Sequence, residues 1–241
     1  MRADQRQPNE LRPVRITPSF IKQASGSALI EVGNTRVICT ASIETGVPNW
    51  MRNSGKGWIT SEYGMLPGST GSRTARESAR GRQSGRTHEI QRLIGRSMRA
   101  IAPLDIIGER TIWIDCDVIE ADGGTRTASI TGAFVALFLA FHQLVKSGDL
   151  PKVPLTDYVA AASVGIVGGV PMLDLCYTED SSADVDMNLV MTGAGKFIEI
   201  QATAEHASTF DDAQTAELIA LGKRGIAQLI ECQKRVLPAL L

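Results

Sequence analysis

The sequence predicts an α+β fold made of two halves of similar plan. In each half, segments of strand character come first and a long helical segment follows, and this order occurs twice along the chain. The composition, with 43% hydrophobic and 21% charged residues, is that of a globular protein. We therefore expect one domain over residues 1–241, with approximate halves at 1–150 and 151–241.

The first half begins with an arm and a hairpin. Residues 2–13 are polar and basic and contain two prolines, which favours an extended arm. Gly33 and Asn34 separate two β-rich runs within residues 27–44, a pattern typical of a hairpin. Further along we expect an irregular segment, a helix and a strand, at residues 50–71, 87–100 and 105–117.

Basic residues concentrate in the first half. Residues 1–100 contain 16 Lys and Arg against 7 Asp and Glu, a balance of +9, whereas residues 101–241 contain 9 against 19, a balance of −10. The net charge of −1 hides this asymmetry. One half can face a polyanion while the other holds metal ions or meets a basic partner.

An arginine tract carries much of that positive charge. Eight arginines and no lysine lie between Arg73 and Arg99, which suggests recognition of planar or phosphate groups. Interspersed Gly and Ser suggest a loop that stays mobile until it meets a partner. The alternative is a basic loop that is merely solvated. The candidate binding residues lie on this loop and along the polar side of the following helix: Arg73, Arg76, Arg80, Arg92, Arg96 and Arg99.

The chain is organised around residues 120–148. A strand leads into Gly123-Gly124, and apolar residues then recur at helical spacing over residues 130–145. The hydroxyl residues Thr125, Thr127 and Ser129 are candidate N-caps. A Gly-rich turn that opens a helix presents free N–H groups and a positive dipole, so we expect an anion site there, to which Arg126 adds a planar guanidinium that suits phosphate.

A second arginine, Arg86, also stands at a predicted helix start. Two such arginines can hold one phosphate between them. The alternative is that residues 120–148 form an ordinary strand–turn–helix whose arginine is solvated.

The second half repeats the order of strands followed by a helix. We expect an acidic turn at residues 179–186 and a final helix at residues 212–237. The expected strands lie at residues 159–170, 170–177, 187–191 and 196–202. Within the turn, Asp180, Asp184 and Asp186 lie close in sequence, and Asp184 shares the parity of Asp186. Clustered carboxylates are tolerated when a hard cation or an arginine sits among them, and a cation there indicates Mg²⁺ with few protein ligands and several waters. The alternative is an acidic turn that faces solvent.

Cysteine usage and hydropathy bear on the compartment. The four cysteines lie far apart without a CxxC pair, which makes a zinc site improbable, and the chain start lacks the apolar core of a signal peptide. No apolar run reaches membrane-spanning length without a polar break. We expect reduced thiols, a cytoplasmic protein and no membrane partner.

Together these stretches resemble the ribonuclease PH family over essentially the whole chain. The residues that carry the resemblance are Met1-Arg-Ala-Asp-Gln-Arg, Ser61-Glu-Tyr-Gly-Met-Leu-Pro-Gly-Ser-Thr, Gly85-Arg-Thr-His-Glu-Ile-Gln-Arg-Leu-Ile-Gly-Arg, residues 117–127 and residues 179–188. The resemblance implies two related βαβ-type halves like domain 2 of ribosomal protein S5, with mixed sheets and helices packed on one side. One departure is visible, because the family pattern leads us to expect glycine at Ala202 and His206.

The same resemblance implies an activity and its site. The family removes nucleotides from the 3′ end of RNA with orthophosphate as co-substrate, trims tRNA precursors and forms a homohexamer, a trimer of dimers. It implies phosphate binding by Arg86, Gly124, Thr125 and Arg126. Asp180 and Asp186 would serve catalysis and, with Asp184 as a less certain third ligand, Mg²⁺ or Mn²⁺. The arginine tract would bind the RNA.

Two alternative functions remain open at this point. A hydrolytic, metal-dependent nuclease would need more carboxylates and no phosphate cradle, which Arg86 and Arg126 argue against. A catalytically silent RNA-binding ring subunit could keep the basic tract while losing Arg126, Asp180 or Asp186, yet all three are present. We therefore expect a phosphorolytic exoribonuclease and tRNA nucleotidyltransferase that acts on tRNA precursors and other RNA 3′ ends.

Overall fold

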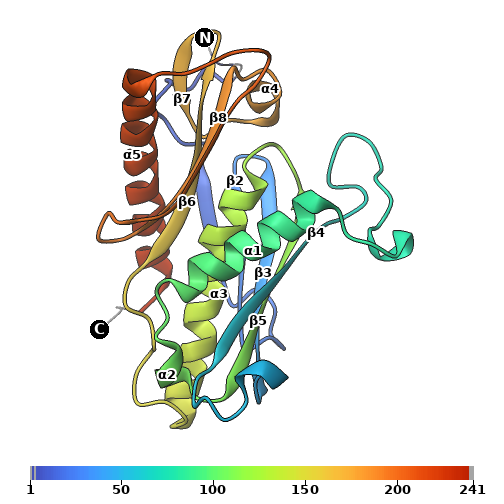
Figure 1. The fold of residues 1–241 in the computed structure, drawn as a ribbon, viewed down its shortest axis with the longest axis vertical. Coiled ribbons are helices and arrows are strands. Elements are labelled where there is room, and N and C mark those ends of the chain that lie inside the picture. Colours follow the sequence, from blue (N-terminus) through green and yellow to red (C-terminus); the bar gives the residue numbers. More distant parts are fainter. Residues whose placement is uncertain (1, 3, 239–241) are drawn as a thin grey trace.

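The first half is a five-stranded sheet with helices against one of its faces. The computed structural model describes residue 2 and residues 4–238. The elements of this half are β1 (Val14–Pro18), β2 (Gly26–Val32), β3 (Thr35–Thr45), β4 (Trp58–Met65), α1 (Gly85–Arg99), α2 (Leu104–Ile107), β5 (Arg110–Glu120) and α3 (Thr125–Ser147), with short 3-10 turns at Asn49–Met51 and Ser78–Arg80. Figure 1 shows their arrangement.

The strand order of this sheet is β1-β2-β3-β5-β4. The pairs are antiparallel except for β4 and β5, which run parallel. Parallel neighbours need a crossover connection, and α1 supplies it between these two strands. The expected mixed sheet and βαβ unit are therefore present in the first half.

The second half is a smaller sheet covered by one long helix. Its elements are β6 (Val159–Val167), β7 (Val170–Leu173), α4 (Tyr177–Asp180), β8 (Val185–Thr192), β9 (Phe197–Ala204) and α5 (Asp212–Val236). The strand order is β7-β6-β8-β9, and every pair is antiparallel. The α+β class is confirmed, but the second sheet is not mixed. Short turns or the short helix α4 join its strands. Such short connections suit antiparallel neighbours, because only parallel neighbours need a long crossover connection.

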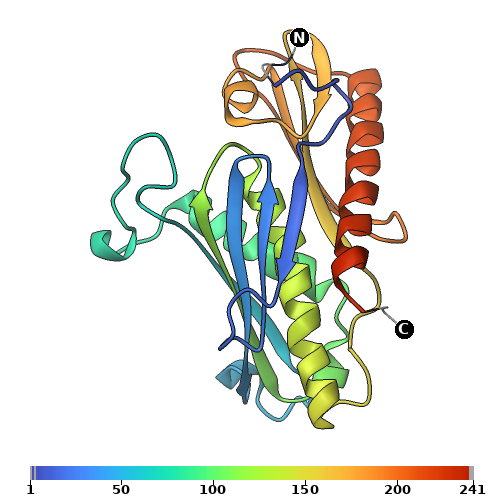
Figure 2. The ribbon, with the colours of Figure 1, turned by 180° about the vertical axis from the view of Figure 1, so that it is seen from behind.

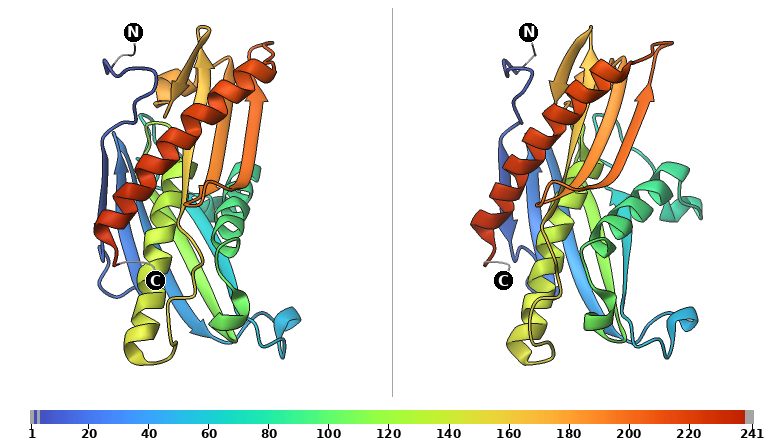
Figure 3. Two further views of the ribbon diagram at one scale, coloured as in Figure 1. Left: turned by 90° about the vertical axis from the view of Figure 1, so that its left-hand side faces the viewer. Right: turned by 60° about the vertical axis from the view of Figure 1, so that its left-hand side comes forward.

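The long helix α3 lies between the two sheets. It packs on β2 and β3 of the first sheet and on β6 of the second, and Figures 2 and 3 show it running between them. Its largest buried side chains are Phe134, Phe138 and Phe141. By length and hydropathy alone α3 could cross a membrane, but 72% of its most apolar window is buried inside the protein. It is a core helix.

Several local predictions are confirmed and others are wrong. The strand expected at residues 105–117 begins only at Arg110, because Leu104–Ile107 form the short helix α2. The hairpin forms around Gly33, and the helices expected at residues 87–100 and 212–237 are α1 and α5. The segment expected to be irregular contains β4, whose residues alternate in burial along the strand. Its partner strand β5 is distant in sequence, since Trp58 pairs with Thr111, 53 residues further on. α3 begins at Thr125 with Gly124 as its N-cap, so the three hydroxyl residues proposed as caps lie inside the helix.

The segment that departs from the family pattern adopts unusual backbone angles. His206 has φ 54° and Ala207 has φ 59°, both in the left-handed region that favours glycine. Ala202 lies within β9 and needs no such freedom. The expectation of glycine at position 206 therefore corresponds to a real conformational demand, which this chain meets with two residues that carry a Cβ.

Candidate active site

The turn before α3 is shaped to present main-chain N–H groups. Gly123 has φ 74° and Gly124 has φ 66°, and a Cβ on Gly123 would lie 2.6 Å from the carbonyl oxygen of Leu175. Within the helix, the Ala128 N–H donates to the Gly124 carbonyl oxygen over 3.0 Å. The N–H groups that precede it have no acceptor in the first turn of the helix, so this end of α3 suits an anion.

Side chains fix this helix start from two directions. The Thr125 hydroxyl lies 2.9 Å from the hydroxyl of Tyr63 on β4, and both residues are buried. The Thr127 hydroxyl donates to the Gly124 carbonyl oxygen over 2.9 Å. Burial raises the pKa of Tyr63, so its hydroxyl stays protonated. The first turn of α3 is therefore anchored to the first sheet by a neutral hydrogen bond between Thr125 and Tyr63.

Arg126 is held by residues from two other elements. Its Nη1 donates to Oε1 of Gln201 on β9 over 2.7 Å and to Oε1 of Glu89 on α1 over 3.2 Å. The Gln201 amide in turn donates to the same Glu89 oxygen over 2.9 Å. Glu89 stands three residues after Arg86 on α1, so both lie on one side of that helix. The guanidinium of Arg126 is thus oriented while its other nitrogens stay available.

One small cavity of about 50 Å³ joins the predicted groups from both halves. Arg86 comes from α1, and the turn and first residues of α3 supply the phosphate-binding candidates. Asp180 closes α4, and Asp186 lies on β8. The lining residues are Arg86, Gly124, Thr125, Arg126, Ser163, Asp180, Asp186 and Asn188. Every predicted phosphate-binding residue and both predicted catalytic aspartates therefore meet at one place, although their binding and catalytic roles stay predictions.

The surroundings raise the pKa of both carboxylates in this cavity. Burial and the nearby Asp180 raise the pKa of Asp186 to about 6, against the opposing effect of Arg126 and the Asn188 hydrogen bond. Partial desolvation also raises the pKa of Asp180, while Arg86 and Arg126 oppose that shift. Two carboxylates that repel one another beside cationic groups form a site that a further cation would relieve.

The structure does not bring the third predicted carboxylate to the other two. Asp184 does not line the cavity, and across residue 2 and residues 4–238 no three His, Cys, Asp or Glu side chains group as metal ligands. β8 begins at Val185, so strand alternation does not extend to Asp184. The oxygens of Asp180, Asp186 and Asn188 still fit a hard cation that keeps several waters, as Mg²⁺ does.

The loop of the arginine tract extends from the body of the protein between β4 and α1 (Figure 1). Arg73, Arg76 and Arg80 lie on this loop, and all three are exposed. Arg76 and Arg80 line a cavity of about 690 Å³ that also contains Arg86 and Asp117. Arg86 borders both cavities, so the cavity lined by the arginine loop adjoins the small site at this residue.

The three arginines predicted along α1 differ in their surroundings. Arg92 is exposed. Arg96 pairs with Glu199 of β9, with Nη2 and Oε2 2.6 Å apart. Arg99 lies 4.4 Å above the ring centre of Trp58 and donates to the carbonyl oxygen of Ile59 over 2.6 Å. Arg96 and Arg99 thus have partners within the chain, and an RNA role for them stays a prediction.

Some residues of the site were not predicted. Tyr63, Glu89, Ser163, Asn188 and Gln201 line it or hold its members. Glu89 could have been found from its spacing to Arg86 on one helix. Asn188 follows Asp186 by two residues on β8, so strand alternation could have found it. Tyr63, Ser163 and Gln201 reach the site only through the pairing of strands, for which the local sequence carries no signal.

Comparison with known proteins identifies the family. Residues 10–141 match the 3′ exoribonuclease family, domain 1, and residues 157–225 match its domain 2. The ribonuclease PH of Solibacter usitatus is 65% identical over 237 residues, covering 98% of this chain and 99% of that protein. The chain belongs to the ribonuclease PH family. The enzyme is accordingly a phosphorolytic 3′ exoribonuclease.

Further members of the ribonuclease PH family and solved structures agree with this assignment. The ribonuclease PH of Listeria welshimeri is 56% identical, covering 98% of this chain and 96% of that protein. An Archaeoglobus fulgidus exosome with RNA bound to the active site superposes with a TM-score of 0.80 at 22% identity, over 95% of this chain and 91% of that one. Rice Rrp46 superposes with a TM-score of 0.78 at 20% identity, over 98% and 100%. These distant structures show the fold.

Proposed function

We propose that this phosphorolytic enzyme trims the 3′ ends of tRNA precursors and other RNAs, releases nucleoside 5′-diphosphates and also runs in reverse as a nucleotidyltransferase. The observation that carries the proposal is the single cavity shared by Arg86, the start of α3 and the two aspartates. In this proposal, Arg86, Arg126 and the turn before α3 form a cradle for a dianion beside the two carboxylates, and the cavity lined by the arginine loop adjoins it at Arg86. Positioning and charge stabilisation are the main demands of phosphoryl transfer.

In the proposed reaction, orthophosphate lies between the Arg86 and Arg126 guanidinium groups and the N–H groups of the Gly124–Thr125 turn. One of its oxygens forms a bond to the phosphorus of the last RNA linkage. The bond from that phosphorus to the 3′ oxygen of the penultimate ribose breaks, and the proton of hydrogen phosphate ends on that oxygen. Since one phosphate linkage replaces another of similar energy, excess nucleoside diphosphate should drive the reverse reaction.

The carboxylates act on the leaving side in this proposal. Asp180 and Asp186 would hold Mg²⁺, with Mn²⁺ as a substitute, and the bound cation supplies positive charge near the leaving oxygen. Asn188 donates to Oδ2 of Asp186 over 3.2 Å and so limits its rotation. No strong protein base is needed, because orthophosphate is itself a charged nucleophile near neutral pH.

The test of the reaction is product analysis on a short RNA, with and without millimolar orthophosphate. We expect nucleoside diphosphates in the presence of phosphate and almost no degradation without it. Nucleoside monophosphates released at equal rates in both buffers would mean a hydrolytic nuclease. That result would refute the proposed role of Arg86, Arg126 and the Gly124–Thr125 turn in binding orthophosphate. A catalytically silent ring subunit would release neither product.

The arginine loop should bind the body of long RNA through phosphate contacts. Replacing Arg73, Arg76 and Arg80 together by Ala should weaken binding of tRNA precursors about 10–100-fold and flatten its salt dependence, because up to three counterion-releasing contacts are lost. Short oligonucleotides should be degraded almost as before. The matched control replaces Arg15, Arg36 and Arg52, which are exposed elsewhere. Equal loss on long and short substrates would place the loop in the active centre instead.

We also propose a homohexamer, a trimer of dimers, in the cytoplasm. The exposed apolar residues Phe197 and Ile200 on the edge strand β9 support association, since an open edge with apolar side chains invites a partner. Light scattering at micromolar concentration should report six times the 25.9 kDa chain mass. A stable monomer there would contradict the assembly, and cell fractionation would check the compartment.

A further inference from the structure

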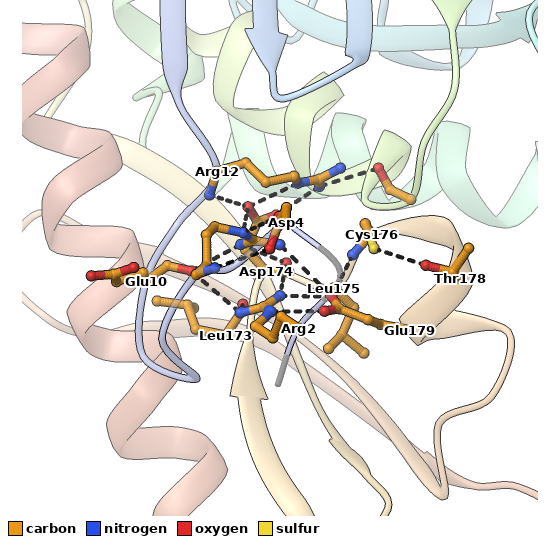
Figure 4. A network of polar contacts seen from close by, with 12 residues as sticks. Arg2, Asp4, Glu10, Arg12, Leu173, Asp174, Leu175, Cys176, Thr178 and Glu179 are labelled. Atoms are coloured by element: carbon orange, nitrogen blue, oxygen red, sulfur yellow. Dashed lines mark hydrogen bonds and ion pairs between the residues drawn. The ribbon is translucent and has the colours of Figure 1, made fainter.

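The N-terminal arm is tied into the protein by buried arginines. Arg2 and Arg12 are only 5% and 4% exposed. Arg2 binds Glu179 with both ends of its guanidinium, Nε to Oε1 and Nη2 to Oε2, each over 2.7 Å. It also donates to the main-chain carbonyl oxygens of Leu173 and Asp174, both over 2.8 Å. Figure 4 shows this network of polar contacts.

Arg12 makes a second set of contacts one step nearer to the active site. Its Nη2 lies 2.7 Å from Oδ1 of Asp174, and its Nε and main-chain N–H donate to Oδ2 over 3.0 and 2.7 Å. Its guanidinium also donates to the carbonyl oxygens of Asp122 and Gly123, which form the turn before α3. One arm side chain thus contacts the phosphate-binding turn and the segment before α4 together.

The arm therefore joins two loops that carry opposite parts of the active site. Glu179 immediately precedes Asp180, and the two share the short helix α4. Asp122 accepts from the Tyr177 N–H at the start of that helix over 3.2 Å. Gly123 packs on the main chain of Leu175 and Cys176. A helix of four residues has little stability of its own, so these contacts fix where Asp180 stands.

The competing explanation for these buried contacts is that the arm only stabilises the fold of the second half. A buried ion pair adds little net stability, because removing both charges from water is costly. Asp174 is held at φ 56°, in the left-handed region. Buried ion pairs and a positive φ cost free energy, so we infer that these contacts hold the loops in a required position more than they stabilise the fold.

We propose that Arg2, Arg12, Asp174 and Glu179 are positioning residues, which hold the Asp180 carboxylate at a fixed place opposite the Gly123–Gly124 turn. The inference rests on the proposed roles of Asp180 and of the phosphate cradle. The N-terminal arm then serves the active site although, at residue 2 and residues 4–13, none of its side chains lines the cavity.

The test separates positioning from folding by steady-state kinetics on a short RNA with Mg²⁺ and orthophosphate. Arg2→Lys keeps the charge but loses the two-pronged contact, and Glu179→Gln keeps the shape but loses the charge. We expect each to lower kcat about 10–30-fold and to raise the Mg²⁺ concentration for half-maximal rate, with KM for RNA unchanged. Arg12→Lys should in addition raise KM for phosphate, because Arg12 contacts the turn.

A merely structural role would lower the melting temperature without changing kcat or the Mg²⁺ requirement of the folded enzyme, and this result would overturn the proposal. If Glu179→Gln does not fold, Arg2→Lys decides the question alone. The matched control is Arg15→Lys, an exposed arginine just past the arm whose Nε lies 3.8 Å from Glu31. Asp180→Asn is measured in parallel. Wild-type activity there would refute the proposed function, whereas loss there with wild-type Arg2→Lys would refute only this inference.

Discussion

Replacement of Asp186 by asparagine is expected to lower kcat about 10²–10⁴-fold while leaving RNA affinity nearly unchanged. Asp186 lies in the small cavity beside Asp180 and faces the two cradle arginines. The amide keeps the shape of the side chain but removes the charge that would hold a cation near the leaving oxygen. Single-turnover kinetics and an RNA-binding titration on the same variant separate the two effects.

The pH dependence follows from the raised pKa of Asp186, about 6. A cation binds the ionised carboxylate, so at limiting Mg²⁺ the rate should fall as the pH drops through about 6. Stability should change in the opposite direction. The folded state favours the protonated acid, so ionisation destabilises the fold as pH rises from the ordinary value of 3.8 to about 6, by roughly 3 kcal/mol at most.

Asp186→Asn removes that cost and should therefore melt at a higher temperature than the parent at pH 8 in chelator, with the difference vanishing near pH 4. Asp184→Asn is the comparison, because Asp184 does not line the cavity, and it should stay within about threefold of the parent rate. Full activity of Asp186→Asn, or of the parent in excess chelator, would eliminate the metal role.

Replacement of Arg126 by alanine is expected to raise KM for orthophosphate about 10–100-fold with RNA affinity little changed. A hydrogen bond to a charged group contributes about 1.5–3 kcal/mol, which corresponds to this range. Glu89 and Gln201 hold one end of the guanidinium, so the lost interaction is that of a pre-oriented group. Initial rates at a series of phosphate concentrations measure the effect.

Arg36→Ala is the matched control for this variant. Arg36 is a half-exposed arginine on β3 that pairs with Glu31 and Glu120, and its loss should leave KM for phosphate unchanged. If Arg126→Ala instead raised KM for RNA alone, the start of α3 would hold the substrate chain and the phosphate would have to bind elsewhere.

The periodicity of apolar residues was enough to predict an element where that element is long or is bounded by a recognisable turn. α3 and α5 were predicted because their apolar residues recur over many turns, and β2 and β3 because Gly33 marks the reversal between them. β4 was missed because it pairs with a strand far along the chain, and its two flanks lack a tight turn. The antiparallel second sheet was missed because pairing direction is set by connections, which strand composition does not encode.

The residues predicted to bind phosphate or to act in catalysis could be found from the sequence, whereas most of the residues that hold them in place could not. Arg86, Arg126, Asp180 and Asp186 stand out by their placement at helix starts or in the acidic turn, and the fold brings them together. Gln201 and Tyr63 reach the site through strand register, a property of the whole sheet. Asp184 shows the limit of parity arguments, since alternation holds only inside a strand and β8 begins one residue later.

The position of α3 has a thermodynamic consequence. One face of the helix rests on β2 and β3 and another on β6, while Gln233 of α5 donates to the carbonyl oxygens of Thr131 and Val159. Separating the halves would expose the apolar surface that α3 shares between them. The chain has two halves in its topology, yet we expect it to unfold as one cooperative unit and neither half to fold when it is excised.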